Sequence, residues 1–179
     1  MAAKMRGPRN GGGDAIPRRR PVVYLLVGLT GSGKTTYAQQ VLEPAGVVRL
    51  SVDELVHQRH GRYGVDYPKQ EYFAREAPVL AEVCKHLAHL VEAGQDVVVD
   101  YGLWLRRERE EWKKLIEQAG GRWRLLYFDV PRQELLRRLA ERNLRDDANA
   151  LAVSPGALED FYTRFEPPGE DEGAEVPSG

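Results

Sequence analysis

The sequence predicts an α/β fold with a doubly wound parallel sheet, and two observations lead to this class. First, short apolar runs alternate along the chain with longer amphipathic segments, as strands and crossover helices do in one parallel sheet. Second, the runs at 22–27 and 97–99 are almost continuously apolar, which is typical of parallel strands covered on both faces. A chain of 179 residues is long enough for one such domain with a single core.

The apolar patterns predict four strands and five longer helices. Residues 55–69 are polar, aromatic and glycine-containing, and we expect a short helix and a loop there. Gly94 is expected to end a long helix, and Gly120 the next one. A fifth strand would fit the pattern but is not located. The expected strands are 22–27, 47–51, 97–99 and 123–129, and the expected helices are 34–43, 70–93, 106–119, 131–143 and 155–165.

Charge is distributed unevenly along the chain, although the formal net charge is only −1. The first residues are rich in Lys and Arg, and the last residues in Asp and Glu. Both ends also contain many glycines and prolines, a composition that does not support a packed core. The expected organisation is a disordered basic tail at 1–20, a domain at 21–166 and a disordered acidic tail at 167–179.

Composition also bears on location and partners. No apolar run approaches the about 20 residues that cross a bilayer, so no membrane partner is expected. The single cysteine, Cys84, cannot form an internal disulfide and lies among apolar residues at helical spacing, which is typical of a core thiol. These features favour a cytoplasmic protein. The near-neutral charge gives no reason to expect nucleic acid as the partner, and the oligomeric state is left open.

The stretch 28–36, between the first strand and the first helix, matches the phosphate-binding pattern G-x-x-x-x-G-K-[ST] in full. Its glycines permit positive φ and let backbone N–H groups approach phosphate oxygens closely. Lys34 is expected to bridge the β- and γ-phosphates of ATP, and the Thr35 hydroxyl to ligate Mg²⁺. A dinucleotide fingerprint would need glycine at Thr36, and no guanine-reading N-K-x-D motif follows a strand. The expected nucleotide-binding residues are Gly28, Thr30, Gly31, Ser32, Gly33, Lys34, Thr35 and Thr36.

With this motif, the expected fold becomes a P-loop NTPase of the kinase-like type, with three α/β/α layers and a short lid segment. In such open sheets, ligands bind at the carboxyl ends of the strands, where several carboxylates stand. Asp53 is the candidate general base for an acceptor hydroxyl and a candidate acceptor ligand, although an Asp there also suits a helix N-cap. Asp100, directly after an apolar strand, is the candidate for holding Mg²⁺ through water or for binding the acceptor.

Arginines that stabilise charge on a transferred phosphoryl group are expected on two helices. Arg138 and Arg142 lie four residues apart, share a helix face and lead into the loop 145–153, which is the candidate lid. Arg109 opens the helix beyond Asp100 and is a candidate for binding substrate. A solvated helix face is the structural alternative for each of these arginines.

Taken with these residues, the chain resembles the small P-loop kinases related to chloramphenicol phosphotransferase, zeta toxins and polynucleotide 5′-kinases. The resemblance covers roughly residues 22–165. In that group an Asp beyond the second strand acts as the base, which implies this role for Asp53. The resemblance also implies ATP and Mg²⁺ as cofactors, held by Lys34 and Thr35.

Outside the phosphate loop, the matching motifs are short. Arg138 and Arg142 match the lid arginines of the group in general position only. The stretch 98–100, followed by Arg106 and Arg109, also resembles AAA-type members described only as ATP-binding proteins. Those members do not identify an acceptor.

These observations favour a kinase that moves the γ-phosphoryl group of Mg-ATP to a hydroxyl of a small molecule, such as an antibiotic, a nucleoside or a sugar. One alternative is a polynucleotide 5′-hydroxyl kinase, which would be expected to have a more basic acceptor channel. Another is a nucleotide-dependent switch or ATPase without an acceptor. The sequence leaves open the acceptor, the strict preference for ATP over GTP and the purpose of the charged ends.

Overall fold

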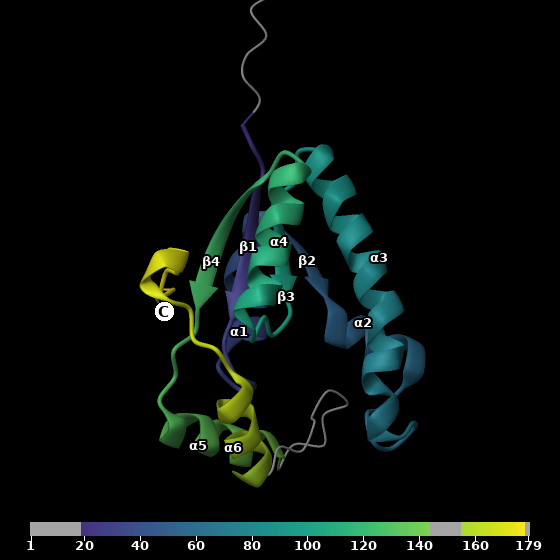
Figure 1. The fold of residues 1–179 in the computed structure, drawn as a ribbon, viewed down its shortest axis with the longest axis vertical. Coiled ribbons are helices and arrows are strands. Elements are labelled where there is room, and N and C mark those ends of the chain that lie inside the picture. Colours follow the sequence, from purple (N-terminus) through teal and green to yellow (C-terminus); the bar gives the residue numbers. More distant parts are fainter. Residues whose placement is uncertain (1–18, 144–154, 178–179) are drawn as a thin grey trace, which may run out of the picture.

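The computed structural model describes residues 19–143 and 155–177 of the chain. Four parallel strands form one sheet in the order β2-β3-β1-β4, with helices on both of its faces (Figure 1). This arrangement confirms the doubly wound α/β class. The strands are β1 Val22–Val27, β2 Val48–Ser51, β3 Val97–Asp100 and β4 Arg122–Tyr127. The helices are α1 Lys34–Tyr37, η1 Ala38–Leu42, η2 Glu43–Ala45, α2 Val52–His60, η3 Lys69–Glu71, α3 Tyr72–Glu92, α4 Arg106–Gln118, α5 Arg132–Asn143, α6 Pro155–Arg164 and η4 Glu170–Glu172.

The central strand β1 is buried on both faces because its side chains alternate between two apolar clusters. Leu25 is fully buried and belongs to the cluster that α3 and α4 cover, together with Leu87 and Ile116. Leu26 points to the opposite face and packs with Ala38 of η1. The continuous apolar sequence of β1 is therefore explained by helices on both sides.

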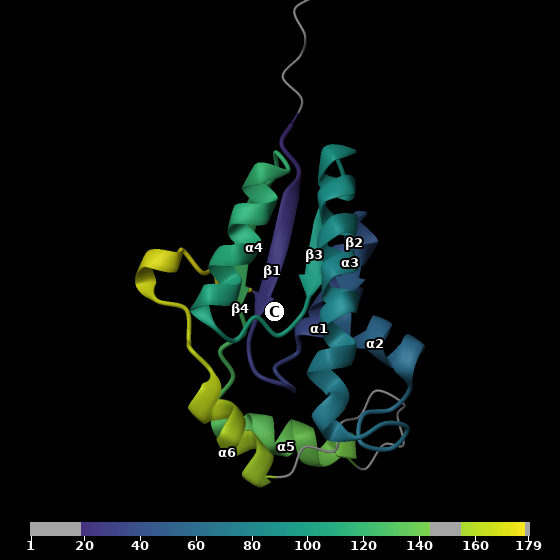
Figure 2. The same cartoon turned by 45° about the vertical axis from the view of Figure 1, so that its right-hand side comes forward.

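A third apolar cluster joins α5 and α6 to the phosphate-binding loop. Leu29 of this loop packs with Leu135 and Leu139 of α5 and with Leu158 of α6. Both helices lie beyond the carboxyl ends of the strands and do not cover a face of the sheet (Figures 1 and 2). This packing positions α5 and its arginines next to the loop.

The expected elements are confirmed to within a few residues, with differences after the loop and after β2. The first helix starts at Lys34 as expected, but only α1 is α-helical, and the chain continues through the π-helical η1 and the 3-10 helix η2. The short helix expected after residue 55 begins at Val52, because the Ser51 hydroxyl caps it by accepting a hydrogen bond from Glu54 N (3.4 Å). Within the described residues the sheet has four strands.

Residues 1–18 of the expected basic tail lie outside the described residues. Arg19 and Arg20 are described and contact the domain: Arg19 pairs with Asp96 at 2.7 Å, and Arg20 donates to the Gly120 carbonyl at 3.2 Å. In the part of the chain that the structure describes, no helix combines the length and the apolar character needed to cross a membrane.

The expectation of a disordered acidic tail from residue 167 is wrong for residues 167–177. This segment runs beside β4, where Glu175 N donates to the Leu125 carbonyl and the Glu175 carbonyl accepts from Tyr127 N, both at 2.8 Å. Three of its carboxylates are also paired: Asp171, Glu172 and Glu175 pair with Arg106, Arg109 and Arg124, respectively. Composition suggested a solvated tail because the partners of its charges lie far away in the sequence.

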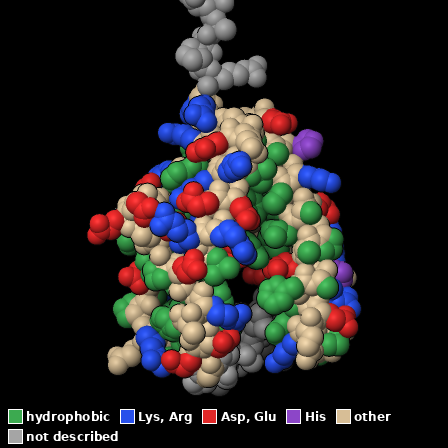
Figure 3. Space-filling model, viewed as in Figure 1, with side chains coloured by type: hydrophobic (Ala, Val, Ile, Leu, Met, Phe, Trp, Pro, Cys, Tyr) green, Lys and Arg blue, Asp and Glu red, His purple; other side chains and the backbone are tan. Residues whose placement is uncertain are grey.

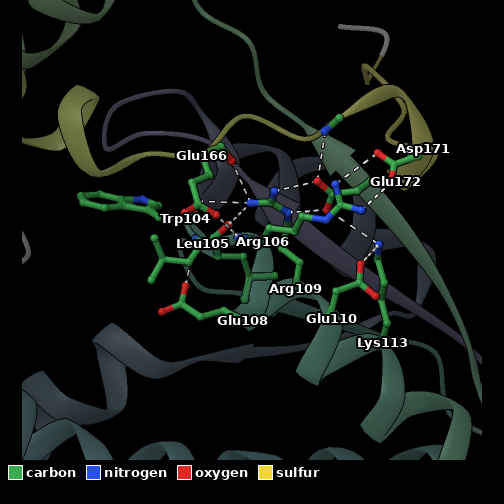
Figure 4. Close-up of polar contacts among 12 residues, drawn as sticks. Trp104, Leu105, Arg106, Glu108, Arg109, Glu110, Lys113, Glu166, Asp171 and Glu172 are labelled. Atoms are coloured by element: carbon green, nitrogen blue, oxygen red, sulfur yellow. Dashed lines mark hydrogen bonds and ion pairs between the residues drawn. The ribbon is translucent and has the colours of Figure 1, made fainter.

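The central contact of this segment is the buried ion pair of Arg109 and Glu172 (Figure 4). Arg109 Nε and Nη2 donate to the two carboxylate oxygens of Glu172, at 2.7 and 2.8 Å. Arg109 Nη1 donates to the carbonyls of Glu166 (2.9 Å), Leu103 and Trp104 (both 3.2 Å). Arg109 is 0% exposed and Glu172 is 2% exposed. A buried ion pair of this kind persists only when its hydrogen bonds are satisfied, so residues 166–172 are an integral part of the domain.

Glu172→Gln would leave the Arg109 guanidinium buried without a counter-charge. We expect this substitution to lower the free energy of unfolding by about 3–5 kcal/mol at pH 7, as measured by urea denaturation. Asp171→Asn is the matched control, since it removes a carboxylate whose pair with Arg106 is exposed, and little effect is expected. Equal effects of the two substitutions would contradict the central role of the buried pair.

Acid is expected to weaken the same contact. Hydrogen bonds from Arg109 hold the pKa of Glu172 at about 2, below its ordinary value of 4.5. Because folding favours the carboxylate, the stabilisation is complete above pH 4.5 and is lost as the pH falls toward 2. The difference in free energy of unfolding between wild type and Glu172→Gln should therefore shrink between pH 5 and the lowest pH at which the protein folds. A difference that does not change with pH would argue against this linkage.

Candidate active site

The candidate site lies at the carboxyl ends of the strands. The face of the molecule is hollowed there, between the α3 side and the α5–α6 side, with both acidic and basic side chains at the border of the hollow (Figure 3). Because β1 and β3 are paired in parallel, the residues that follow them meet at this edge. The phosphate-binding loop follows β1, and Asp100 ends β3.

The loop has the backbone that its glycines predict. Gly28 and Gly33 have φ values of 153° and 98°, which L side chains rarely adopt. A Cβ at Gly28 would also lie 2.8 Å from Ser32 Oγ and 3.0 Å from the Phe128 carbonyl oxygen. Lys34 Nζ donates to the carbonyls of Gly28 (2.8 Å) and Leu29 (2.9 Å), so the amine lies over the loop. The geometry is that of a preformed phosphate cradle.

The two residues expected to hold a metal ion are brought together. Thr35 Oγ1 donates to Asp100 Oδ1 at 3.1 Å, and Asp100 is 5% exposed. A hydroxyl and a carboxylate beside a phosphate cradle are the oxygen ligands that suit Mg²⁺, either directly or through water. The described residues hold no group of three or more His, Cys, Asp or Glu placed for a metal. Phosphate oxygens of a nucleotide would therefore have to complete the coordination.

Arg49 of β2 is a site residue that the sequence analysis missed. Its Nη1 donates to Asp100 Oδ2 at 2.9 Å, and its Nη2 donates to the two carboxylate oxygens of Glu54 at 2.9 and 2.7 Å. Burial lowers the pKa of Arg49, but hydrogen bonds to Glu54 and Asp100 outweigh this and raise it overall. The available signal was a charged residue in the middle of an otherwise apolar strand.

Asp53 lies on the first turn of α2, facing the start of α3. The Tyr72 hydroxyl donates to Asp53 Oδ1 at 2.8 Å, which orients the carboxylate. One turn further along α3, Glu76 accepts a hydrogen bond from the Tyr101 hydroxyl at 3.1 Å and is buried. Burial raises the pKa of Glu76, the hydrogen bonds from Tyr101 and Tyr72 oppose this rise, and the charge of Asp53 adds to it. No role was expected for Tyr72 and Glu76, because the sequence of α3 is that of an ordinary amphipathic helix, or for Tyr101, which directly follows β3.

Arg138 of α5, one of the two arginines expected to serve a lid, contacts the phosphate loop. Its Nη1 donates to the Ser32 carbonyl at 3.3 Å, and its Nε donates to Glu134 at 2.7 Å. It borders a cavity of about 530 Å³ behind the cradle. The lining residues of this cavity are Gly31, Ser32, Gly33, Thr36, Tyr37, Gln40, Val41, Phe128, Arg138 and Pro177. The side chain of Arg142 and the expected lid at 145–153 lie outside the described residues.

One expected substrate ligand is corrected. Arg109 cannot contact a substrate, because its side chain is fully buried and its donors bind Glu172 and three backbone carbonyls. Its position after Asp100 suggested the site, but the start of α4 directs the side chain toward the C-terminal segment (Figure 4).

The chain is similar in sequence to several known proteins. A UPF0200 protein of Aeropyrum pernix is 31% identical, over 82% of this chain and 90% of that protein. A shikimate kinase of Synechococcus elongatus is 34% identical over 64% of this chain and 55% of that enzyme. The match therefore spans little more than half of the shikimate kinase. Kinase relatives of this kind support a P-loop phosphotransferase, without specifying its substrate.

A solved structure shows the same fold, and a family model matches most of the described chain. The APS kinase of Mycobacterium tuberculosis, in complex with AMPPNP and APS, superposes with a TM-score of 0.60 over 89% of this chain and 90% of that chain. Its sequence identity of 22% limits the likeness to the fold. The model of a family described as AAA domain matches residues 23–168. The chain therefore belongs to this AAA domain family, a family of P-loop proteins with a kinase-like fold.

Proposed function

We propose that the protein is a kinase that transfers the γ-phosphoryl group of Mg-ATP to a hydroxyl of a small molecule. The observation that carries this proposal is the 3.1 Å contact of Thr35 with Asp100 at the mouth of a complete phosphate cradle. The position of Asp53 supports it further, because Tyr72 orients this carboxylate at the same end of the sheet.

Different residues would serve different steps of phosphoryl transfer. Backbone N–H groups of 28–36 hold the phosphates, and Lys34 neutralises charge on the transferred group. Thr35 and Asp100 would hold Mg²⁺, which when bound neutralises charge on the β- and γ-phosphate oxygens. The acceptor oxygen attacks the γ-phosphorus, the bond to the leaving ADP oxygen breaks, and Asp53 accepts the hydroxyl proton or orients that oxygen.

The cavity behind the cradle is the proposed site of the nucleobase. Its volume of about 530 Å³ is within the range of small-molecule sites, and Tyr37 and Phe128 contribute aromatic rings to its wall. Arg138 lies at its border, where a guanidinium can stack on a planar base. Pro177 is another lining residue, so the C-terminal segment takes part in the proposed nucleotide site.

Two substitutions test the transfer. Lys34→Ala should abolish transfer of label from γ-labelled Mg-ATP, and Asp53→Asn should reduce it about 10²–10⁴-fold while nucleotide binding persists, because only the proton acceptor is lost. The acceptor panel consists of hydroxylated antibiotics, nucleosides, sugars and a 5′-hydroxyl oligonucleotide. Glu92→Gln, at the far end of α3, is the control and should have no effect.

The remaining outcomes of the transfer assay would contradict the proposal in different ways. Full transfer by Asp53→Asn would refute its assignment as the base. Label transferred only to the oligonucleotide would favour the polynucleotide kinase alternative. ATP hydrolysis without any labelled acceptor, unchanged in Asp53→Asn, would favour an ATPase or switch.

The proposed metal ligands can be tested separately. Asp100→Asn should weaken the affinity for Mg²⁺ about 10–100-fold, because a neutral amide is a poorer partner for the ion or its water. The measurement is the Kd for a fluorescent ATP analogue with Mg²⁺ and with a chelator. Only the Kd with Mg²⁺ should rise in the variant. An equal rise under both conditions would assign Asp100 to the integrity of the loop and not to the metal.

A further inference from the structure

We infer that the hydroxyl acceptor is an uncharged, polyhydroxylated molecule, and that Glu76 selects it against acceptors carrying phosphate, sulfate or carboxylate. This inference rests on the phosphotransfer proposed above and concerns the acceptor side of the same site. It assigns to Glu76 a specificity role that goes beyond the candidate base and the phosphate cradle.

The acceptor side is formed by α2, the start of α3 and the turn after β3. Tyr72 and Glu76 are four residues apart on α3 and therefore share a helix face. Tyr72 donates to Asp53 at 2.8 Å, and Tyr101 donates to Glu76 at 3.1 Å. The base and the buried Glu76 thus stand side by side, linked to tyrosine hydroxyls from two elements. The hollow in the surface, with both acidic and basic side chains at its border, lies at this end of the sheet (Figure 3).

The carboxylates on the acceptor side disfavour an anion; the nearby cation Lys69 lies over the Tyr63 ring, 5.8 Å from its centroid. Asp53 of α2 and Glu76 of α3 contribute two carboxylates on this side, whereas the charge of Asp100 is already paired with Arg49. The arginines of the surrounding segment 49–76 are each paired with a carboxylate. These pairs are Arg49 with Glu54 and Asp100, Arg59 with Glu82, Arg62 with Asp66, and Arg75 with Glu71. An anionic acceptor is best held by an arginine fork whose donors are available, and the forks of Arg49 and Arg75 already bind carboxylates.

A neutral acceptor with several hydroxyls suits the same groups. A carboxylate offers about four acceptor positions, so Glu76 can accept from a substrate hydroxyl in addition to its tyrosine partners. A tyrosine oxygen can in turn accept a hydrogen bond from a second hydroxyl. Tyr63 adds an aromatic edge next to Tyr72, with ring centroids 5.4 Å apart, against which the C–H face of a sugar-like ring can pack. We therefore assign one hydroxyl to Asp53, for phosphorylation, and another to Glu76, for recognition.

The experiment compares matched acceptors that differ mainly in charge. The full chain is assayed with γ-labelled Mg-ATP on a nucleoside and its 5′-monophosphate, and on a sugar alcohol and the corresponding sugar acid. The expected result is a kcat/KM at least tenfold higher for the neutral member of a pair that is phosphorylated. Equal or better use of the anionic member would overturn the inference.

Glu76→Gln tests the residue itself, because it removes the charge and keeps the shape. The variant should raise kcat/KM for the anionic member about fivefold or more, mainly through KM, so that the ratio within the pair approaches one. Glu92→Gln on the same helix is the control and should leave the ratio unchanged. An unchanged ratio in folded Glu76→Gln would refute the role of Glu76. If Glu76→Gln does not fold, Tyr101→Phe takes its place and should raise KM for the neutral acceptor without changing kcat.

A binding experiment distinguishes failure of this inference from failure of the proposed phosphotransfer. Saturation-transfer NMR is recorded for each pair on the protein with Mg²⁺ and a non-hydrolysable ATP analogue. Binding of neutral members alone, without any labelled product, would support the acceptor class and contradict the proposed transfer. Binding of anionic members alone, or of no neutral member of the panel, would overturn the acceptor class whatever the transfer assay gives.

Discussion

The parallel pairing of β1 with β3 is the constraint on which the candidate site depends. Val23, Tyr24 and Leu25 of β1 are in register with Val97, Val98 and Val99 of β3. The residues that follow these two strands therefore emerge at one edge of the sheet, which places Thr35 within 3.1 Å of Asp100. β2 also ends at this edge, because Ser51 is in register with Asp100. The helix that follows it, α2, has Asp53 on its first turn. The site is thus a consequence of strand order.

Arginine has a different role in each part of this protein. Arg49 is held among carboxylates beside the proposed metal ligand, where it can fix the position of Asp100. Arg109 is buried and ties the C-terminal segment to α4 through Glu172 (Figure 4). Arg138 is the arginine that the structure places at the phosphate loop, next to the proposed nucleobase cavity. These roles cannot be told apart from the residue type or its place in the sequence. They differ in the group to which each guanidinium donates.

The C-terminal segment links stability to the proposed nucleotide site. Its single bridge to β4, between Leu126 and Glu175, lies at the free edge of the sheet, the position a further strand would occupy. The same segment is anchored by the buried Glu172 and reaches the cavity behind the cradle at Pro177. An acidic stretch that resembles a tail in composition therefore completes the edge of the sheet and one wall of a cavity.

Local chemistry in the sequence was sufficient for the strands, most helices and the phosphate cradle. The loop 28–36 is predictable because its motif is local: the glycines permit the turn, and Lys34 and Thr35 follow at the spacing of the phosphate-binding pattern. Asp100 was predictable as the residue that follows an apolar strand. By contrast, Arg109 and Glu172 are 63 positions apart, and Tyr101 and Glu76 are 25 apart. Whether such a side chain is exposed to solvent, or buried and paired, depends on which distant side chain contacts it. The packing of α3 and α4 on the sheet brings these residues together. A charge that is buried by this packing needs a partner to offset its desolvation, and residue type alone does not show which charges are buried.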